Sequence, residues 1–197
     1  MTHTKTEWRV LLLKARAAVN ERARGSYSAA INGRLTALPG FEDSRAIFLY
    51  TPLGAEVDLR ALTTAAAASG KAIYLPHEGA SPAWVRQSGG SAGNRGERAS
   101  IPNEPALVIV PGVGFDSRGI RLGRGRGFYD RALAALRRKR AAFVIGVAFE
   151  VQVVERLPRD FWDEPVDLVA TERRLIVPLP LPESQPTRQG AGEAYER

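Results

Sequence analysis

The sequence has no cysteine, and two of its 197 residues are histidine. The lack of cysteine excludes a disulfide framework, a thiolate nucleophile and a cysteine-ligated zinc site. His3 lies near the chain start and His77 in an expected loop, so a histidine-rich metal site is excluded and a serine–histidine–aspartate triad has no supporting motif. Any metal is therefore expected to be a hard cation held by carboxylates and phosphates.

Long apolar runs are also missing. No segment approaches the roughly 20 apolar residues that cross a bilayer. The apolar residues 11–13 are too few for a secretory signal, and the acidic Glu7 precedes them. We therefore expect a cytoplasmic protein without a membrane partner.

Basic residues outnumber acidic ones by 28 to 21, for a formal net charge of +7. This excess has two interpretations: attraction to anions such as nucleotides, acidic substrates or nucleic acid, or an arginine-rich composition without a function of its own. No RNP, KH, helix-turn-helix or zinc signature of a nucleic-acid-binding protein occurs. We expect no nucleic-acid partner and look for function in local clusters of arginine.

One such cluster is residues 121–130, where glycines alternate with arginines before two aromatic residues and an aspartate. An apolar run precedes it and a helical pattern follows. A glycine-rich loop that opens a helix brings backbone N–H groups close to phosphate oxygens, and arginines add charge-assisted contacts. The loop is neither a Walker A motif nor a good dinucleotide fingerprint. It indicates a polyphosphate site such as a nucleotide site, or simply a loop whose glycines permit turns.

Strand-like and helical patterns alternate along the chain. Strands are expected at residues 45–50, 71–75, 83–86, 106–110, 143–147 and 166–169, and helices at 5–23, 28–38, 57–69 and 131–140. Thr4 and Glu7 match a capping box at the first helix, Gly25-Ser26 is expected to break it, and Pro76 to stop the second strand. Each expected strand is a mostly continuous run of apolar residues, without polar and apolar residues in alternation. This pattern predicts an α/β fold with a mostly parallel sheet and helices on both faces, as a single three-layer domain.

The domain is expected to cover residues 1–177, and the proline-rich and polar residues 178–197 to form a disordered tail. Residues 88–103 are rich in Gly, Ser, Asn and Arg and predict a loop, either a lid over the central motif or a tolerated surface loop.

Three further positions admit both a functional and a structural interpretation. Glu56 stands between a strand end and a helix start, where α/β sheets bind ligands, but it also suits a helix N-terminus. Lys5 and Arg9 share a helix face that is either functional or solvated. Asp130 falls in the first helical turn, where it can hold Mg²⁺ beside bound phosphates or complement the helix dipole.

The motif residues closely resemble the signature of the 5-formyltetrahydrofolate cyclo-ligase (5,10-methenyltetrahydrofolate synthetase) family. The signature covers residues 111–116, Gly119 and residues 121–131. Other pieces of the chain are similar to the family's remaining pattern: Lys5 with Arg9, Tyr50, Pro52, residues 56–58, residues 146–149, Gln152, Pro158, Asp163, Asp167, Thr171 and Glu172. The resemblance spans most of residues 5–172, with a gap at about 84–103.

The resemblance implies an enzyme that uses ATP and Mg²⁺ to convert 5-formyltetrahydrofolate to 5,10-methenyltetrahydrofolate, with ADP and phosphate as by-products. In the family, ATP phosphorylates the formyl oxygen, N10 attacks the activated carbon, and phosphate leaves. We expect a cytoplasmic monomer or weak dimer whose partner is the small-molecule folate substrate. The residues implied for ATP are Lys5, Arg9, Arg121, Leu122, Gly123, Arg124, Gly125, Arg126, Gly127, Phe128 and Tyr129.

Tyr129 and Arg124 are the implied catalytic residues, Asp130 and Asp163 the implied metal carboxylates, and Glu56 the acid that hydrogen-bonds the pterin. The sequence departs from the family where its folate-contacting, methionine-containing strand should stand, since the sole methionine is Met1. We expect Trp84 to supply the apolar pterin contact instead.

Smaller departures are Phe128 for a usual tyrosine, Arg126 for a frequent glycine and Trp162 for a frequent histidine. Two alternatives stay open: a divergent paralogue that uses the same ATP site on another formyl or amide substrate, and a basic nucleic-acid-binding protein.

Overall fold

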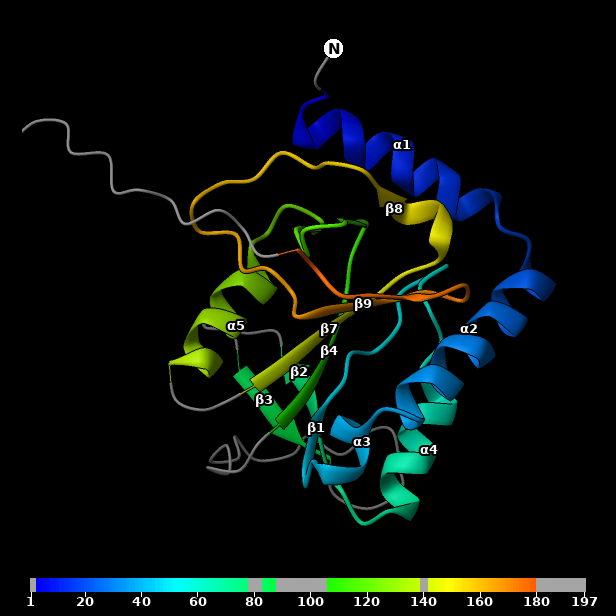
Figure 1. Cartoon of the computed structure of the whole chain (residues 1–197), viewed down its shortest axis with the longest axis vertical. Helices are drawn as coiled ribbons and strands as arrows, with labels where there is room; N and C mark the ends of the chain where they lie inside the picture. Colours follow the sequence, from blue (N-terminus) through cyan, green and yellow to red (C-terminus); the bar gives the residue numbers. More distant parts are fainter. Residues whose placement is uncertain (1–2, 78–82, 88–105, 139–141, 180–197) are drawn as a thin grey trace, which may run out of the picture.

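A computed structural model describes residues 3–77, 83–87, 106–138 and 142–179. Within these ranges the chain forms a seven-stranded sheet in the order β10-β9-β7-β4-β1-β2-β3 (Figure 1). Its strands are β1 (Ala46–Phe48), β2 (Ala72–His77), β3 (Ala83–Arg86), β4 (Ala106–Pro111), β7 (Ala142–Val147), β9 (Leu168–Ala170) and β10 (Leu175–Ile176). The helices are α1 (Lys5–Ala18), α2 (Glu21–Thr36), α3 (Pro39–Asp43), α4 (Arg60–Ala68) and α5 (Phe128–Arg137).

The five inner strands of this sheet run parallel, and the edge strands β3 and β10 are antiparallel to their neighbours. Successive residues of β4 face opposite sides. Leu107 and Ile109 pack in one core with residues of α2, α3 and α4, while Val108 and Val110 pack in a second core with residues of α5. Both faces of β4 are buried, which explains its continuous apolar run. The predicted three-layer α/β fold is confirmed.

A second, small sheet was not predicted. It contains β6 (Arg121–Leu122), β5 (Gly114–Asp116) and β8 (Val153–Val154), and a 3₁₀ turn, η1 (Glu150–Gln152), precedes β8. Its strands have two or three residues, too few for a recognisable alternation in the sequence. Leu12 of α1 packs against Leu122 and other residues of a third apolar cluster beside this sheet. The small sheet thus holds α1 next to the start of the glycine–arginine loop.

The predicted division between the first two helices is wrong. α1 ends at Ala18, and Asn20 caps α2, its side-chain oxygen accepting a hydrogen bond from the N–H of Ala23 at 2.8 Å. Gly25 and Ser26 lie inside α2. A glycine inside a helix costs about 1 kcal/mol relative to alanine, which is less than the advantage of a good cap combined with burial of Ile31 and Leu35.

The predicted end of β2 is also wrong, because Pro76 lies within the strand. The N–H of Leu49 donates to the carbonyl of Tyr74, so the backbone polar groups of Tyr74 point toward β1. The backbone nitrogen of Pro76, two residues further along the strand, points to the same side. β1 pairs with β2 only as far as Tyr74. No neighbouring strand therefore needs an N–H from residue 76, and the proline is tolerated.

Other boundaries shift by a few residues. α4 begins at Arg60 instead of residue 57, which leaves Glu56 in a loop, and α5 begins at Phe128 instead of residue 131. β10 was not predicted. Of the predicted tail, residues 180–197 lie outside the described residues, as does the predicted loop at 88–103. Among the described residues, no helix combines the length and apolar character needed to span a bilayer.

Candidate active site

A cavity of about 880 Å³ lies beyond the carboxyl ends of β1, β2 and β4, the edge at which α/β sheets bind ligands. Its volume is in the range of pockets that enclose small-molecule ligands. Residues from α1, the loop after β1, the glycine–arginine loop and the segment before β9 line it. They include Lys5, Arg9, Glu56, residues 121–130, Asp160, Trp162 and Asp163. The folding of the chain therefore brings together nearly all the predicted site residues.

The glycine–arginine loop turns sharply before α5. Gly125 and Gly127 have φ angles of 99° and 61°, a left-handed conformation that favours glycine. Gly127 is the N-cap of α5, and no side chain caps that helix. The first N–H groups of α5 therefore need partners from elsewhere, and a helix N-terminus of this kind attracts anions. The helix predicted after the glycine–arginine loop is present and begins at Phe128, three residues earlier than expected.

Arg121 and Asp130 form an ion pair at the base of this loop. The Arg121 guanidinium donates to Oδ1 of Asp130 at 2.8 Å and lies 5.4 Å from the centre of the Tyr129 ring. The side chain of Arg121 is buried, and its Nε has no hydrogen-bond partner among the described residues. This buried donor at the cavity wall is suited to an additional acceptor.

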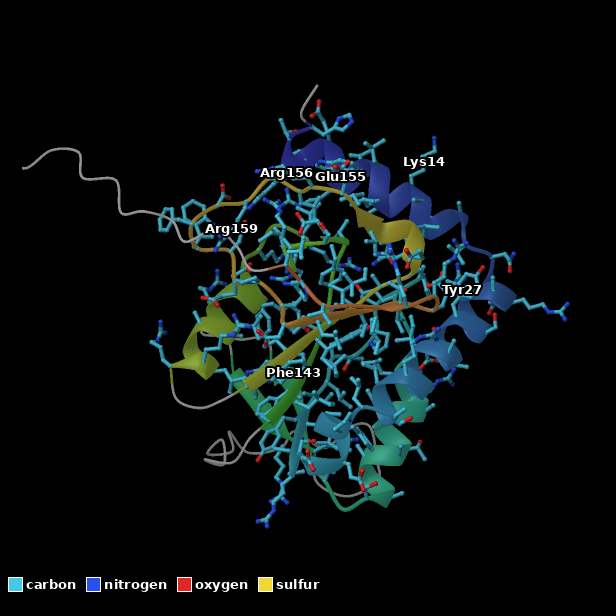
Figure 2. The ribbon with its side chains drawn as sticks, in the orientation of Figure 1. Lys14, Tyr27, Phe143, Glu155, Arg156 and Arg159 are labelled. Carbon is cyan, nitrogen blue, oxygen red and sulfur yellow. The ribbon has the colours of Figure 1, made fainter. Side chains whose placement is uncertain are left out.

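α1 contributes two cations from one face. Nε of Arg9 donates to the carbonyl of Gly123 at 2.9 Å, and its guanidinium lies beside Gly125. Nζ of Lys5 donates to Asp160 at 2.8 Å and to Asp163 at 2.5 Å. The segment carrying these carboxylates follows β8 and runs past α1, with Glu155, Arg156 and Arg159 along it (Figure 2).

The electrostatic environment of Lys5 combines opposing effects. Partial burial works to lower the pKa of Lys5, but the hydrogen bonds and negative charges of Asp160 and Asp163 outweigh it. The pKa of Lys5 therefore lies above its ordinary value, and the ammonium keeps its charge in the neutral range. Lys5 therefore contributes a positive charge to the cavity wall at neutral pH.

Glu56 lines the same cavity, with its side chain 8% exposed. Its Oε1 accepts a hydrogen bond from Arg124 at 2.9 Å and lies 3.6 Å from a guanidinium nitrogen of Arg16, while its Oε2 accepts from the N–H of Leu53 at 3.0 Å. Glu56 does not cap α4, whose N-cap is Leu59. The ligand-edge interpretation of Glu56 thus agrees with the geometry better than the helix-capping one.

Trp84 does not line the cavity as the described residues define it. Its ring is buried, 5.0 Å from that of Phe48 and 6.4 Å from that of Tyr129. The expected contact of Trp84 with the substrate therefore has no support in this geometry. Trp84 packs behind Tyr129, because the alternation of β3 directs it into the apolar core.

Sequence reasoning missed two charged residues of the site. Asp160, like Asp163, accepts a hydrogen bond from Lys5, and Arg16 forms an ion pair with Glu56. Arg16 follows Arg9 by seven residues, or two helical turns, so this spacing could have predicted that both lie on the same face of α1. Asp160 had no comparable signal, because its neighbours form no regular pattern.

The two predicted metal carboxylates each keep one oxygen available. Oδ1 of Asp130 is engaged by Arg121 and Oδ2 of Asp163 by Lys5. Hydrogen bonds to their second oxygens are not found in the part of the chain that the structure describes, and no cluster of three acidic or histidine side chains occurs there. This donor set does not form a closed protein cage. It fits a Mg²⁺ ion that arrives with phosphate oxygens and takes one or two carboxylates.

Comparison with known proteins gives one consistent answer. Residues 1–172 match the model of the 5-formyltetrahydrofolate cyclo-ligase family. The chain is 30% identical over 195 residues to the 5-formyltetrahydrofolate cyclo-ligase of Mycolicibacterium smegmatis, an alignment that covers 89% of this chain and 97% of that one. A shorter alignment to the Haemophilus influenzae 5-formyltetrahydrofolate cyclo-ligase is 45% identical over 65 residues, 32% of this chain and 34% of that one.

Solved structures agree with the sequence matches. The NMR structure of Aquifex aeolicus 5,10-methenyltetrahydrofolate synthetase superposes with a TM-score of 0.73 at 34% identity, covering 97% of this chain and 96% of that one. The 5,10-methenyltetrahydrofolate synthetase of Mycoplasma pneumoniae gives a TM-score of 0.71 at 25% identity, covering 86% and 99%.

Proposed function

Since the chain belongs to the 5-formyltetrahydrofolate cyclo-ligase family, we propose that it converts 5-formyltetrahydrofolate to 5,10-methenyltetrahydrofolate at the expense of ATP, which binds with Mg²⁺. The observation that carries the proposal is the convergence of four separate chain segments on one cavity. The cations of α1 and of the glycine–arginine loop line it together with Glu56.

The triphosphate is assigned to the part built by Lys5, Arg9 and residues 121–129. There it meets the uncapped N-terminus of α5 and the guanidinium groups of Arg124 and Arg126. Phosphoryl transfer needs positioning and neutralisation of charge more than a protein nucleophile, and this set of groups supplies both. Mg²⁺ bound with ATP would neutralise further charge, with Asp130 and Asp163 as its carboxylates.

The pterin is assigned to the part near Glu56, whose carboxylate accepts hydrogen bonds from the N–H groups of the pterin ring. Tyr129 lines the cavity and is partly buried against both apolar cores, and we assign it to the meeting point of the formyl group and the γ-phosphate. In this arrangement the formyl oxygen attacks the γ-phosphorus of ATP, and the bond from that phosphorus to the ADP oxygen breaks. N10 then attacks the formyl carbon and loses its proton, and phosphate leaves with the former formyl oxygen.

The direct test mixes the purified chain with ATP, Mg²⁺ and 5-formyltetrahydrofolate and follows both the methenyl chromophore and ADP. We expect equal amounts of both products, and none when ATP is omitted. ATP binding without the chromophore would refute this folate specificity and favour a paralogue acting on another formyl or amide compound. Salt-dependent binding to RNA or DNA without affinity for ATP would refute the enzymatic function itself.

A substitution tests the assignment of the loop. Arg124→Ala removes a cation from the triphosphate part and should raise KM for ATP or lower kcat, with the fold intact because its side chain is 52% exposed. Arg60→Ala is the matched control, since it removes an arginine that is 91% exposed and does not line the cavity. Unchanged kinetics in Arg124→Ala would refute the role assigned to this residue.

A further inference from the structure

Glu56 is contacted by two arginines that differ in their attachment. The side chain of Arg16 is 7% exposed and belongs to the last turn of α1, whereas that of Arg124 is 52% exposed and stands between Gly123 and Gly125. Arg124 therefore has room to turn to another partner. Arg16 is enclosed on a helix whose position is set by its packing, so it stays beside Glu56.

Arg124 is attracted by both halves of the proposed site. In the present geometry it is bound to Glu56, but it also belongs to the loop that would surround a triphosphate. A triphosphate carries more negative charge than one carboxylate, so its arrival should draw Arg124 away from Glu56. Glu56, nearly buried, would then keep the N–H of Leu53 and the guanidinium of Arg16. An enclosed carboxylate without a counter-charge is strongly disfavoured.

The groups around Glu56 leave Arg16 as its lasting counter-charge. Burial lowers the pKa of the Arg16 guanidinium and the charge of Glu56 opposes this change, but arginine starts so high that it remains protonated. Tyr50 supplies no charge, since burial, followed by the nearby Glu56 and Tyr129, raises its pKa well above the ordinary value. The hydroxyl of Tyr50 instead donates to the carbonyl of Val57 at 2.9 Å.

We propose that Arg16 is a positioning residue for substrate binding. It holds the Glu56 carboxylate in place and neutralises it when Arg124 moves to the triphosphate, so that this acid receives the pterin while the nucleotide is bound. The inference rests on the proposed function and extends it. It also assigns to Arg124 an exchange between two partners, through which ATP binding prepares Glu56 for the folate.

The test compares Arg16→Met, Arg16→Lys and the control Lys14→Met. Lys14 is on the same helix, is exposed and points away from the body of the molecule (Figure 2). We expect Arg16→Met to raise KM for 5-formyltetrahydrofolate by about tenfold or more, as befits loss of a partner from an enclosed charge pair. KM for ATP should rise by a smaller factor than KM for the folate, since Glu56 without Arg16 holds Arg124 more firmly against the triphosphate. Arg16→Lys should recover part of the loss, and Lys14→Met should match the wild type.

KM for ATP distinguishes a positioning role of Arg16 from a purely structural one, because α1 also carries Lys5 and Arg9, which are assigned to ATP. If Arg16 merely keeps the helix in place, Arg16→Met will raise KM for ATP as much as KM for the folate, and the proposal is overturned. An unchanged folate KM overturns it as well. Should Arg16→Met fail to fold, the charge-preserving Arg16→Lys decides by the same comparison, since its shorter side chain should raise the folate KM selectively.

Binding measured by calorimetry gives a readout independent of turnover. With a non-hydrolysable ATP analogue present, 5-formyltetrahydrofolate should bind Arg16→Met about tenfold more weakly than the wild type. A wild-type protein that neither binds nor converts the folate would overturn the proposed function together with the role of Arg16. An active wild type whose folate affinity is unaffected by Arg16→Met would overturn the present inference alone.

Discussion

Gly125→Ala tests whether the left-handed turn of the glycine–arginine loop is required for ATP binding. Gly125 has a φ angle of 99°, and a Cβ built on it would lie 3.6 Å from the guanidinium carbon of Arg9, an ordinary van der Waals distance. The substitution therefore adds no clash. Its cost is backbone strain alone, which for a residue held in a sparsely populated region amounts to about 1–3 kcal/mol.

The strain should appear in function more than in stability. Residues 124–126 are exposed, so the loop can relax to another conformation without uncovering the core. The strain then becomes a penalty on the loop conformation that we propose binds the phosphates. A penalty of about 1–3 kcal/mol lowers the competent fraction roughly 5- to 150-fold, and the apparent KM for ATP should rise by the same factor.

The assay is an ATP titration of methenyl formation, joined by calorimetric binding of an ATP analogue without folate. Gly70→Ala is the matched control. Gly70 has a φ angle of 68°, a Cβ there meets no atom within 4 Å, and the residue lies between α4 and β2, away from the cavity. We expect Gly70→Ala to lose about 1 kcal/mol of stability with KM for ATP unchanged.

Wild-type affinity for ATP in Gly125→Ala would refute this reasoning, because it would mean that nucleotide binding does not need the loop geometry described above. A rise in KM accompanied by an equal effect in Gly70→Ala would refute it too, since the cause would then be general destabilisation.

Three further predictions concern the metal carboxylate, the buried tryptophan and the first helix. Asp130→Asn should increase the Mg²⁺ concentration needed for half-maximal rate, because it removes a proposed metal ligand and the counter-charge of Arg121; an unchanged Mg²⁺ titration would contradict the assignment. Trp84→Phe should lower the unfolding midpoint but leave KM for the folate unchanged, since Trp84 packs behind Tyr129. A selective rise in that KM would instead support a direct contact between Trp84 and the pterin. The N–H and hydroxyl of Thr4 hold the pKa of Glu7 below its ordinary value, so the capping box should stabilise α1 above about pH 4.3, the ordinary value, and lose this effect as pH falls through the native pKa. Glu7→Gln should therefore have a smaller change in unfolding midpoint between pH 6 and pH 2 than the wild type, and equal changes would refute the link.

Several parts of the molecule were accessible from the sequence because they depend on neighbouring residues. The apolar run of β4 predicts a strand covered on both faces, and Leu107 and Val108 indeed face different cores. The spacing of glycines and arginines in residues 121–130 predicts a phosphate loop before a helix. The boundary between the first two helices was harder to predict, because two local signals competed for it. Gly25-Ser26 looks like a helix break, yet α2 begins after its N-cap Asn20 and continues through both residues.

The tertiary structure decided which charges meet. Glu56 and Arg124 are 68 positions apart and Lys5 and Asp163 are 158 apart, so no local pattern encodes either pairing. The pairing of Lys5 with Asp163 depends on how α1 packs beside the small sheet formed by β5, β6 and β8, whose strands are too short to recognise in the sequence. Trp84 packs in the core because the alternation of β3 directs it there.

The sequence by itself therefore determined the layers of the fold and the turn and helix of the glycine–arginine loop, because burial and turn geometry act over a few consecutive residues. The three-dimensional structure decided the partners of Glu56, and with them the place of Arg16, because electrostatic contacts depend on distances in space between segments remote along the chain.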